Sequence, residues 1–414
     1  MLKFLDAERC LNCKVPKCVE GCPINNRIPE FISQIKNKNY EEAYKIIRAI
    51  SPLGAICGRV CPHENQCQGS CVRGIKEQPI LIGELEAAIC DWARENKIKI
   101  KYDIKENNIK VAIIGSGPSG IACAVELRKL GYDVTIFEKE NFLGGILMYG
   151  IPEYRLSKKI VAEVIEDLLE LGIKVEVNTI LLSNDSIKKD FAKAENKKII
   201  TLENLFKQNY KAIFLGIGTE TSNILPIEGN SIYGVFGANE FLKNERDCKD
   251  KKVIVIGGGN VAMDSARVAK KEGADVTIVY RKQKENMPAN KSEIEAAEKE
   301  GVKFIFGTNV IKINALSNEN RISTIECDTD KIIETDYVIM AIGSTANESY
   351  LNEKIKLTEQ GLIDINENYE TSIENVYAGG DLVQKKATVC MAIKNGKEAA
   401  ISMDKNVKSS LETT

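Results

Sequence analysis

The sequence predicts an α/β protein in which two Rossmann-like, three-layer domains follow a smaller α-helical domain. Its 414 residues are enough for two or three domains, and 43% of them are hydrophobic. Two apolar runs end in clusters of glycine, and each is followed by a helix-like segment and a further apolar run, which is the pattern of a β-α-β unit. Before these units, the chain places eight of its 13 cysteines in two short runs.

The first 107 residues are expected to form the helical domain. Apolar side chains recur there at helical spacing over Ile28–Lys36 and Tyr40–Ile50, and Pro79–Arg94 predicts a turn followed by a helix. The charged stretch Lys97–Lys110 has the composition of a linker. We therefore predict that the helical domain spans residues 1–107.

The two β-α-β units begin at matching apolar strands. Val111–Ile114 leads through glycines and a helix to Val134–Phe137, and Val253–Ile256 leads in the same way to Val276–Tyr280. This repetition predicts a duplicated nucleotide-binding architecture.

Two further strand-like runs, 212–218 and 337–343, also end in glycine turns and are expected to lie near the crossings between the two nucleotide domains. The predicted division is a first nucleotide domain in two parts, 108–240 and 346–414, with the second domain, 241–345, between them.

Composition excludes several classes of function. A net charge of -2 argues against a nucleic-acid-binding protein. No apolar run reaches the length of a membrane span, and no signal-peptide core is visible, so we expect a cytoplasmic protein whose cysteines are not in disulfides. His63 is the only histidine, which argues against a histidine triad or a multi-histidine metal site.

The cysteine runs have the spacing of metal-cluster ligands. The first run is closed by Cys-Pro, and the two runs consist of Cys10, Cys13, Cys18 and Cys22, then Cys57, Cys61, Cys67 and Cys71. Thiolates in such runs are what a pair of [4Fe–4S] clusters needs, which predicts a ferredoxin-like domain. The internal spacing differs from that of ferredoxins, so ferredoxin ligand pairing cannot be transferred. Structural zinc is the alternative. Zinc sites usually combine two C-x2-C pairs, however, and this sequence has only one.

The first glycine cluster predicts a dinucleotide site. It directly follows a strand and opens a helix, so a pyrophosphate can lie at the positive end of that helix. An acid at the end of the next strand is placed to accept hydrogen bonds from ribose hydroxyls. The predicted binding residues are Gly115, Gly117, Pro118, Ser119, Gly120 and Glu138.

The second glycine cluster predicts a nicotinamide-nucleotide site made by Gly257, Gly259, Asn260 and Val261. The strand that follows ends in Arg281 and Lys282, where an NADH site would carry an acid. Because a basic pair there would accommodate a 2′-phosphate, we predict NADPH, with NADH as the alternative if the pair only faces solvent.

Both cysteine runs and both glycine clusters, in this order, resemble the glutamate synthase small (beta) subunit family. That family includes the flavin subunit of bacterial dihydropyrimidine dehydrogenase and the large subunit of the NADH-dependent ferredoxin:NADP oxidoreductase. The resemblance covers nearly the whole chain. It implies FAD at the first nucleotide site, with further contacts from Gly144, Gly145, Gly380, Asp381 and Thr388. Thr388 could instead be an ordinary helix cap.

The same resemblance implies how the cysteines share two [4Fe–4S] clusters. One cluster would be held by Cys10, Cys13, Cys18 and Cys71, and the other by Cys22, Cys61, Cys67 and Glu86. Glu86 could instead be a solvated helix glutamate. Cys57 is left over and is expected to pack near the clusters. We expect the scattered cysteines to be buried hydrophobic residues, namely Cys90, Cys123, Cys248, Cys327 and Cys390.

These parts imply an FAD-dependent NAD(P)H oxidoreductase that feeds electrons to a partner. Hydride would pass from NADPH to FAD, and single electrons would then pass through the clusters, which requires positioning rather than a catalytic side chain. The partner would be a pyrimidine-reducing subunit or a glutamate synthase large subunit, in a hetero-oligomer. Leu53–Cys57 and Gln78–Ile80 resemble the dihydropyrimidine dehydrogenase flavin subunit.

Three alternatives remain open. The chain could be a ferredoxin-linked, bifurcating NAD(P)H transhydrogenase subunit. It could be a thioredoxin-reductase-like disulfide reductase, but residues 241–343 contain only the widely separated Cys248 and Cys327. It could also be a redox-sensing regulator, but no basic helix-turn-helix pattern is visible.

Overall fold

The structure is a computed structural model, and it describes residues 2–183, 196–244, 246–316, 319–347, 351, 354–384 and 388–412. The chain forms two compact units. Unit 1 comprises Met1–Met148, Glu153–Gly218 and Asn347–Thr414, and unit 2 comprises Tyr149–Pro152 and Thr219–Ala346. Among the described helices, none is long and apolar enough to cross a membrane.

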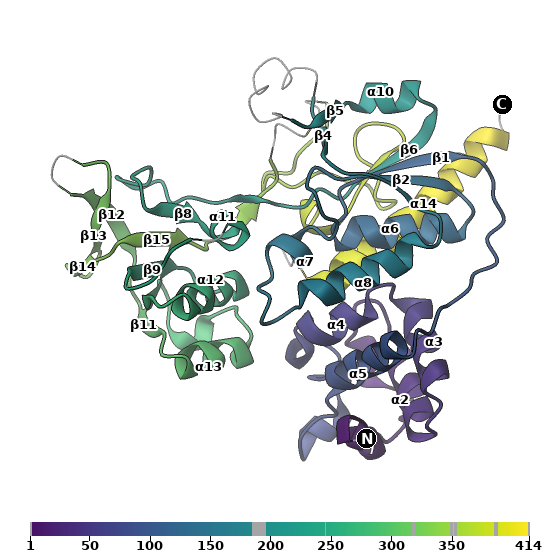
Figure 1. Ribbon diagram of the computed structural model, residues 1–414, viewed down its shortest axis with the longest axis horizontal. Coiled ribbons are helices and arrows are strands. Elements are labelled where there is room, and N and C mark those ends of the chain that lie inside the picture. Colours follow the sequence, from purple (N-terminus) through teal and green to yellow (C-terminus); the bar gives the residue numbers. More distant parts are fainter. Residues whose placement is uncertain are drawn as a thin grey trace. The chain divides into compact units, whose positions relative to one another are not determined.

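The N-terminal part of unit 1 is helical, as predicted (Figure 1). In two of its helices, Ile28–Lys36 and Tyr40–Ile50, the apolar side chains recur at intervals of three and four residues and are buried. Both helices therefore have the bounds that the spacing predicts. The segment that follows, 96–109, contains neither helix nor strand. The elements are η1 (Leu2–Arg9), α1 (Lys17–Glu20), α2 (Ile28–Lys36), α3 (Tyr40–Ile50), α4 (Gly54–Val60), η2 (His63–Asn65), η3 (Val72–Ile75) and α5 (Ile82–Glu95).

Helices α4 and α5 approach each other closely because glycine lies between them. A Cβ added to Gly58 would lie 2.6 Å from the backbone nitrogen of Ala87 and 2.8 Å from the carbonyl oxygen of Gly83. Both neighbours are backbone atoms of α5 and cannot move aside as a side chain could. This contact brings Cys57 of α4 and Glu86 of α5 onto neighbouring helices in close packing.

The rest of unit 1 is built on a parallel sheet of order β17-β6-β1-β2-β3. All its neighbouring strands are parallel, and every strand except the edge strand β3 is largely buried, as expected of a doubly wound sheet. Its strands are β1 (Lys110–Ile114), β2 (Asp133–Phe137), β3 (Lys174–Glu176), β6 (Tyr210–Leu215) and β17 (Val376–Ala378).

Two helices far apart in the sequence, α6 (Pro118–Lys129) and α14 (Val389–Glu412), pack side by side against each other (Figure 1). A Cβ added to Gly396 of α14 would lie 2.1 Å from the carbonyl oxygen of Ser119 in α6, so glycine permits this contact. Further along, Cys123 Sγ lies 3.8 Å from Met403 Sδ. The C-terminal helix is therefore part of the core of the sheet domain.

Helix α8 (Lys158–Leu169) joins the sheet domain to the helical part within unit 1. Arg48 donates to Asp167 Oδ2 at 3.3 Å, and Lys99 Nζ lies 2.9 Å from Asp167 Oδ1. These three residues help to line a cavity of about 340 Å³ between the two parts. The remaining described elements of unit 1 are α7 (Ile146–Tyr149), β4 (Thr179–Leu181), β5 (Lys198–Ile200), α10 (Leu202–Lys207) and η7 (Gly380–Leu382).

Unit 2 contains a second parallel sheet of order β11-β10-β9-β15-β8. Alternate residues of β9 face two different cores: Val253 and Val255 lie in the helix-covered core, whereas Ile254 and Ile256 lie in the core shared with an antiparallel sheet. The parallel strands are β8 (Val235–Gly237), β9 (Lys252–Ile256), β10 (Asp275–Tyr280), β11 (Lys303–Phe306) and β15 (Tyr337–Met340).

The helices of unit 2 are α11 (Ala238–Lys243), α12 (Asn260–Lys271), η5 (Lys284–Asn286) and α13 (Lys291–Lys299). Its antiparallel sheet consists of β12 (Val310–Ala315), β13 (Ile322–Cys327) and β14 (Ile332–Glu334). The two segments that connect this unit to unit 1 pair with each other as β7 (Thr221–Ser222) and β16 (Ser344–Thr345). This architecture confirms the predicted pair of Rossmann-like domains behind a helical domain.

Candidate cluster and nucleotide sites

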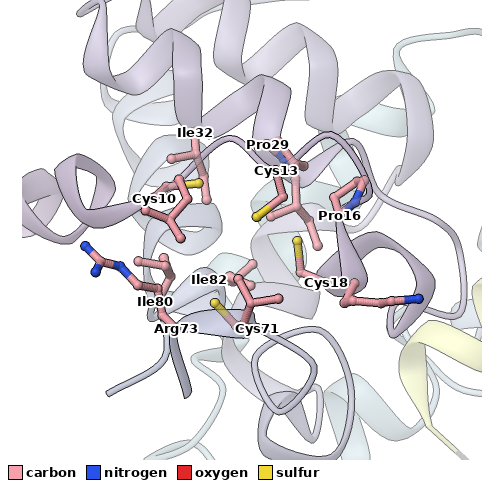
Figure 2. Close-up of a pocket in the computed structure, with 14 residues that line it drawn as sticks. Cys10, Cys13, Pro16, Cys18, Pro29, Ile32, Cys71, Arg73, Ile80 and Ile82 are labelled. Atoms are coloured by element: carbon pink, nitrogen blue, oxygen red, sulfur yellow. The ribbon is translucent and has the colours of Figure 1, made fainter. Parts of the chain in front are cut away.

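The first four predicted thiols line one cavity. Figure 2 shows the sulfur atoms of Cys10, Cys13, Cys18 and Cys71 pointing toward one another across it. The remaining lining is mostly apolar and includes Ile28, Ile32, Ile80 and Ile82. All four cysteines are half-exposed. Four converging thiols in an apolar cavity match the donor set that a [4Fe–4S] cluster takes.

Local backbone geometry brings these thiols together. Asn12, between the first two cysteines, has φ +50°, a conformation that asparagine tolerates better than most residues. Lys36 Nζ donates to the carbonyl oxygen of Cys10 at 2.7 Å and ties the loop to α2. Arg73 Nε donates to the carbonyl oxygen of Arg9 at 2.8 Å and ties η3 to the same loop.

Burial changes the acidity of one thiol in this first set. It raises the pKa of the Cys18 thiol to about 11, and the neighbouring Cys71 and Cys10 add to the shift. Because metal–sulfur clusters bind thiolates, their insertion must release the protons of these thiols.

The second predicted set, Cys22, Cys61, Cys67 and Glu86, is buried. Burial, followed by the thiols of Cys22 and Cys390, raises the pKa of Glu86. Asn26 Nδ2 donates to Glu86 Oε1 at 3.1 Å. The alternative of a solvated helix glutamate is therefore wrong, because Glu86 faces the cysteines from inside the domain. No three His, Cys, Asp or Glu side chains among the described residues are grouped so that they could hold a single metal ion.

Two further thiols lie near this second set. The neighbouring Cys390 thiol, followed by that of Cys61, lowers the pKa of Cys57, and the Cys390 thiol raises the pKa of Cys22. Cys57 was expected near the clusters, whereas Cys390 was expected only as a buried hydrophobic residue. Cys390 is buried, as expected, but other thiols are among its neighbours. No spacing pattern could have found it, because most of the chain separates it from the cysteine runs.

At the first nucleotide site, the predicted glycines form a tight loop against neighbouring backbone. Gly115 has φ +91°, and a Cβ there would lie 2.7 Å from the carbonyl oxygen of Gly216. A Cβ at Gly120 would lie 2.0 Å from the carbonyl oxygen of Gly115. Helix α6 begins at Pro118 directly after Gly117, so its free N–H groups open toward this loop.

Glu138 and Ser116 hold that loop in place. The Oε2 atom of buried Glu138 accepts a hydrogen bond of 2.9 Å from the backbone nitrogen of Ser116 and another, of 2.5 Å, from its hydroxyl. The hydroxyl oxygen of Ser116 in turn accepts from the backbone nitrogen of Gly144 at 3.0 Å. A Cβ at Gly145 would lie 3.0 Å from the Cα atom of Gly117. The predicted Gly144 and Gly145 therefore lie directly beside the glycine loop.

The predicted C-terminal residues lie on the elements around this loop. A Cβ at Gly380 would lie 2.7 Å from Ser119 Oγ, which places η7 against the start of α6. Burial raises the pKa of the neighbouring Asp381 to about 6. Thr388 Oγ1 accepts from the backbone nitrogen of Met391 at 3.2 Å and thus acts as an N-terminal cap of α14.

In unit 2, the second glycine loop has the same character. Gly257 has φ +141°, and its Cβ would lie 2.2 Å from the carbonyl oxygen of Ala341. Helix α12 begins at Asn260 after Gly259, whose Cβ would meet no atom within 4 Å, so space remains above the helix N-terminus. Asn260 Oδ1 accepts from the backbone nitrogen of Asn290 at 2.9 Å, and Val261 is partly exposed in the first turn.

Arg281 and Lys282 directly follow β10 and are exposed. Because β9 and β10 are parallel neighbours, this basic pair and the glycine loop lie at the same edge of the sheet. The two cysteines of unit 2 lie apart: Cys248 is in the helix-covered core and Cys327 is in the core on the antiparallel sheet. They cannot form the paired thiols that a disulfide reductase would need there.

Comparisons with known proteins agree with this arrangement. Residues 109–396 match the family model described as pyridine nucleotide-disulphide oxidoreductase, and residues 3–98 match that of dihydropyrimidine dehydrogenase domain II, 4Fe-4S cluster. The fold resembles a thioredoxin reductase from T. acidophilum with a TM-score of 0.54 at 22% identity, over 74% of this chain and 100% of that one.

Two curated relatives cover almost the whole chain. The NAD-dependent dihydropyrimidine dehydrogenase subunit PreT of Escherichia coli O157:H7 is 33% identical over 97% of this chain and 93% of its own length. The glutamate synthase [NADPH] small chain of Escherichia coli K12 is 31% identical over 95% of this chain and 89% of its own. The chain therefore belongs to the glutamate synthase small subunit family and is an FAD-dependent NAD(P)H oxidoreductase with an N-terminal 4Fe-4S domain.

Proposed function

We propose that this chain is an electron-input subunit that passes electrons from NADPH through FAD and two [4Fe–4S] clusters to a partner catalytic subunit. The observation that carries this proposal is helix α14. Its Gly396 packs on the first turn of α6 at the flavin site, and its Lys397 contacts Ile50 of the helical part. One helix thus links the flavin site to the part of the chain that carries the buried thiols.

The two thiol sets differ in a way that suits a relay. The second set is buried beside α14, whereas the first is half-exposed. Electrons would enter the buried set from the flavin and leave through the exposed set. Lys397 Nζ donates to the carbonyl oxygen of Ile50 at 2.6 Å, which anchors α14 to the helical part along this route.

Each nucleotide site contributes binding and orientation. At the first site, the N-terminus of α6 would bind the pyrophosphate, and Glu138 would hold the loop and receive ribose hydroxyls. FAD supplies the ability to take two electrons together and release them singly. At the second site, Arg281 and Lys282 would bind a 2′-phosphate and so favour NADPH over NADH.

The surface around the first thiol set supports an exit toward another protein. Leu11, which lines the cavity, is 59% exposed, and Ile75 at the end of η3 is 80% exposed. Val15, between the second and third cysteines, is also exposed. Large exposed apolar side chains around a redox centre are typical of a docking surface.

The names of the relatives favour two kinds of partner, a pyrimidine-reducing subunit and a glutamate synthase large subunit, and the identities of 33% and 31% do not separate them. A ferredoxin acceptor, as in a bifurcating transhydrogenase, is the second candidate because the exposed first set would also admit a small redox protein.

The test is purification of the native complex without oxygen. We expect about eight irons and one FAD per chain, on a two-cluster protein, and faster flavin bleaching by NADPH than by NADH. About four irons would refute the second cluster, and equal bleaching rates would remove the role of Arg281. The co-purifying subunit identifies the acceptor, and a complex with neither a catalytic subunit nor ferredoxin would contradict the relay.

A further inference from the structure

Asn395 is a buried amide of α14 that lies beside the predicted flavin site. It is 5% exposed, and the next residue, Gly396, packs on Ser119 of α6. Asparagine and glycine are both weak helix formers, so this pair weakens the interior of a helix of 24 residues. A buried polar side chain must also find hydrogen-bond partners, and the partners of Asn395 indicate what it does.

The oxygen of this amide holds the Asp381 loop, residues 379–381. The backbone nitrogen of Gly380 donates to Asn395 Oδ1 at 3.2 Å, and that of Gly379 donates at 3.2 Å to the carbonyl oxygen of the last residue of β6. Two consecutive N–H groups of the loop are thus fixed from different sides. Because Gly380 has φ +74° and directly precedes Asp381, the amide acts on the backbone next to a predicted FAD contact.

The nitrogen of the amide is oriented by a tyrosine and a carboxylate. Asn395 Nδ2 donates to the hydroxyl oxygen of Tyr369 at 3.2 Å, and the Tyr369 hydroxyl donates to Glu398 Oε2. Burial, followed by the Glu398 carboxylate, raises the pKa of Tyr369 to about 12, so the hydroxyl keeps its proton at neutral pH. A carboxylate only accepts, so the single hydroxyl proton goes to Glu398 and the hydroxyl oxygen accepts from Asn395. This order determines which end of the amide faces Gly380.

The backbone of Tyr369 has an uncommon conformation. Its φ is +62°, in a region that large side chains rarely occupy. Its carbonyl oxygen accepts a hydrogen bond of 3.0 Å from the backbone nitrogen of Ala378, the residue directly before the Asp381 loop. Residues in such conformations persist where the surrounding structure holds them, and they cluster at ligand sites.

We propose that Asn395 is a positioning residue for FAD, which fixes the Asp381 loop through the N–H group of Gly380, while Tyr369 and Glu398 set the orientation of its amide. This inference deepens the proposed function, because it requires FAD at the first nucleotide site. With leucine in place of Asn395, that N–H group would be left unpaired, and FAD would have to order the loop when it binds. The affinity for FAD therefore reports the effect of the amide.

The experiment is an anaerobic equilibrium dialysis against FAD of the complete chain, from which FAD has first been removed. Asn395→Leu deletes both hydrogen bonds of the amide, whereas Tyr369→Phe deletes only the one that orients it. Asn406→Leu is the matched control, because Asn406 of the same helix donates to the Tyr377 hydroxyl at 2.7 Å but lies roughly 16 Å further along the helix. The melting temperature of each FAD-free protein shows whether the variant folds.

For Asn395→Leu we expect a roughly tenfold higher dissociation constant of FAD, and for Tyr369→Phe a roughly threefold higher one. The double variant should bind FAD as Asn395→Leu does, because Tyr369 acts only through the amide. Asn406→Leu should bind FAD as the original chain does. If Asn395→Leu does not fold, Tyr369→Phe decides by itself, and an unchanged dissociation constant then overturns the proposal.

The remaining outcomes separate this inference from the function on which it rests. An original chain that does not bind FAD would refute the proposed function itself. If the original chain binds FAD and Asn395→Leu binds it as tightly, only the positioning role is overturned. Equal losses in Asn395→Leu and Asn406→Leu, or additive losses in the double variant, would make Asn395 a general stabiliser of α14 and would also overturn that role.

Discussion

Replacing Gly58 with alanine should loosen the helical part around the second thiol set. The added Cβ would lie 2.6 Å from the nitrogen of Ala87 and 2.8 Å from the carbonyl oxygen of Gly83. These two atoms are four residues apart in α5, so they are the donor and acceptor of one helical hydrogen bond. The methyl group would therefore push into the backbone of the partner helix and not into a flexible side chain.

The magnitude follows from three contributions. Overpacking costs about 1–3 kcal/mol, and weakening one backbone hydrogen bond costs about 1 kcal/mol more. Alanine regains roughly 1 kcal/mol because it favours the helix more than glycine does. The net loss is about 1–3 kcal/mol, and since a domain of this size loses about 4–8 °C per kcal/mol, the helical part should melt roughly 5–20 °C lower.

The assay heats the anaerobic protein and follows two signals: cluster absorbance reports the helical part, and flavin fluorescence reports the sheet domain. The cluster transition should fall in Gly58→Ala while the flavin transition moves less. Gly74→Ala is the control, because its Cβ would meet Pro79 only at 3.5 Å, an ordinary contact. The precision of such melting temperatures is about 2 °C. The reasoning would be refuted if the cluster transition of Gly58→Ala lay within that range of the original.

Three further predictions concern function. Replacing Arg281 and Lys282 with alanine should slow flavin reduction by NADPH roughly 10- to 100-fold at low nucleotide concentration and leave NADH unaffected, because two charge-assisted bonds to a 2′-phosphate are lost; equal losses with both nucleotides would contradict this. Ile75→Glu should raise the KM for the partner subunit roughly tenfold but not change reduction of a small dye. The equally apolar and exposed Ile332 gives the control variant Ile332→Glu, and the same KM effect from it would dismiss the docking surface. Because burial raises the pKa of Cys18 to about 11, thiolate increases with pH, and cluster reconstitution of the iron-free chain should accelerate up to roughly tenfold per pH unit between pH 7 and 9. A rate independent of pH would show that proton release does not limit insertion.

Local sequence patterns were enough to predict much of the fold. The bounds of α2 and α3 match the predicted Ile28–Lys36 and Tyr40–Ile50 because their apolar positions repeat at the helical period and end at polar residues. The glycine loops at Gly115 and Gly257 were predictable because a tight turn between a buried strand and a helix tolerates little else.

The second thiol set was only partly predictable. Resemblance placed Cys22 and Glu86 together, and the structure buries both at one site. The place of Cys390 near Cys22 could not be predicted, because a buried cysteine in an amphipathic helix gives the same pattern whatever it faces. That place depends on which helices pack together, and local sequence does not contain this tertiary information.

The path of α14 has a consequence for biosynthesis. Lys397 of α14 contacts Ile50 of the helical part, which leaves the ribosome long before α14 does. During translation the helical part therefore lacks this contact until α14 has been made. On the proposed two-cluster function, insertion of the second cluster should then follow synthesis of α14, and a nascent chain stalled before α14 should take up iron at the first thiol set alone.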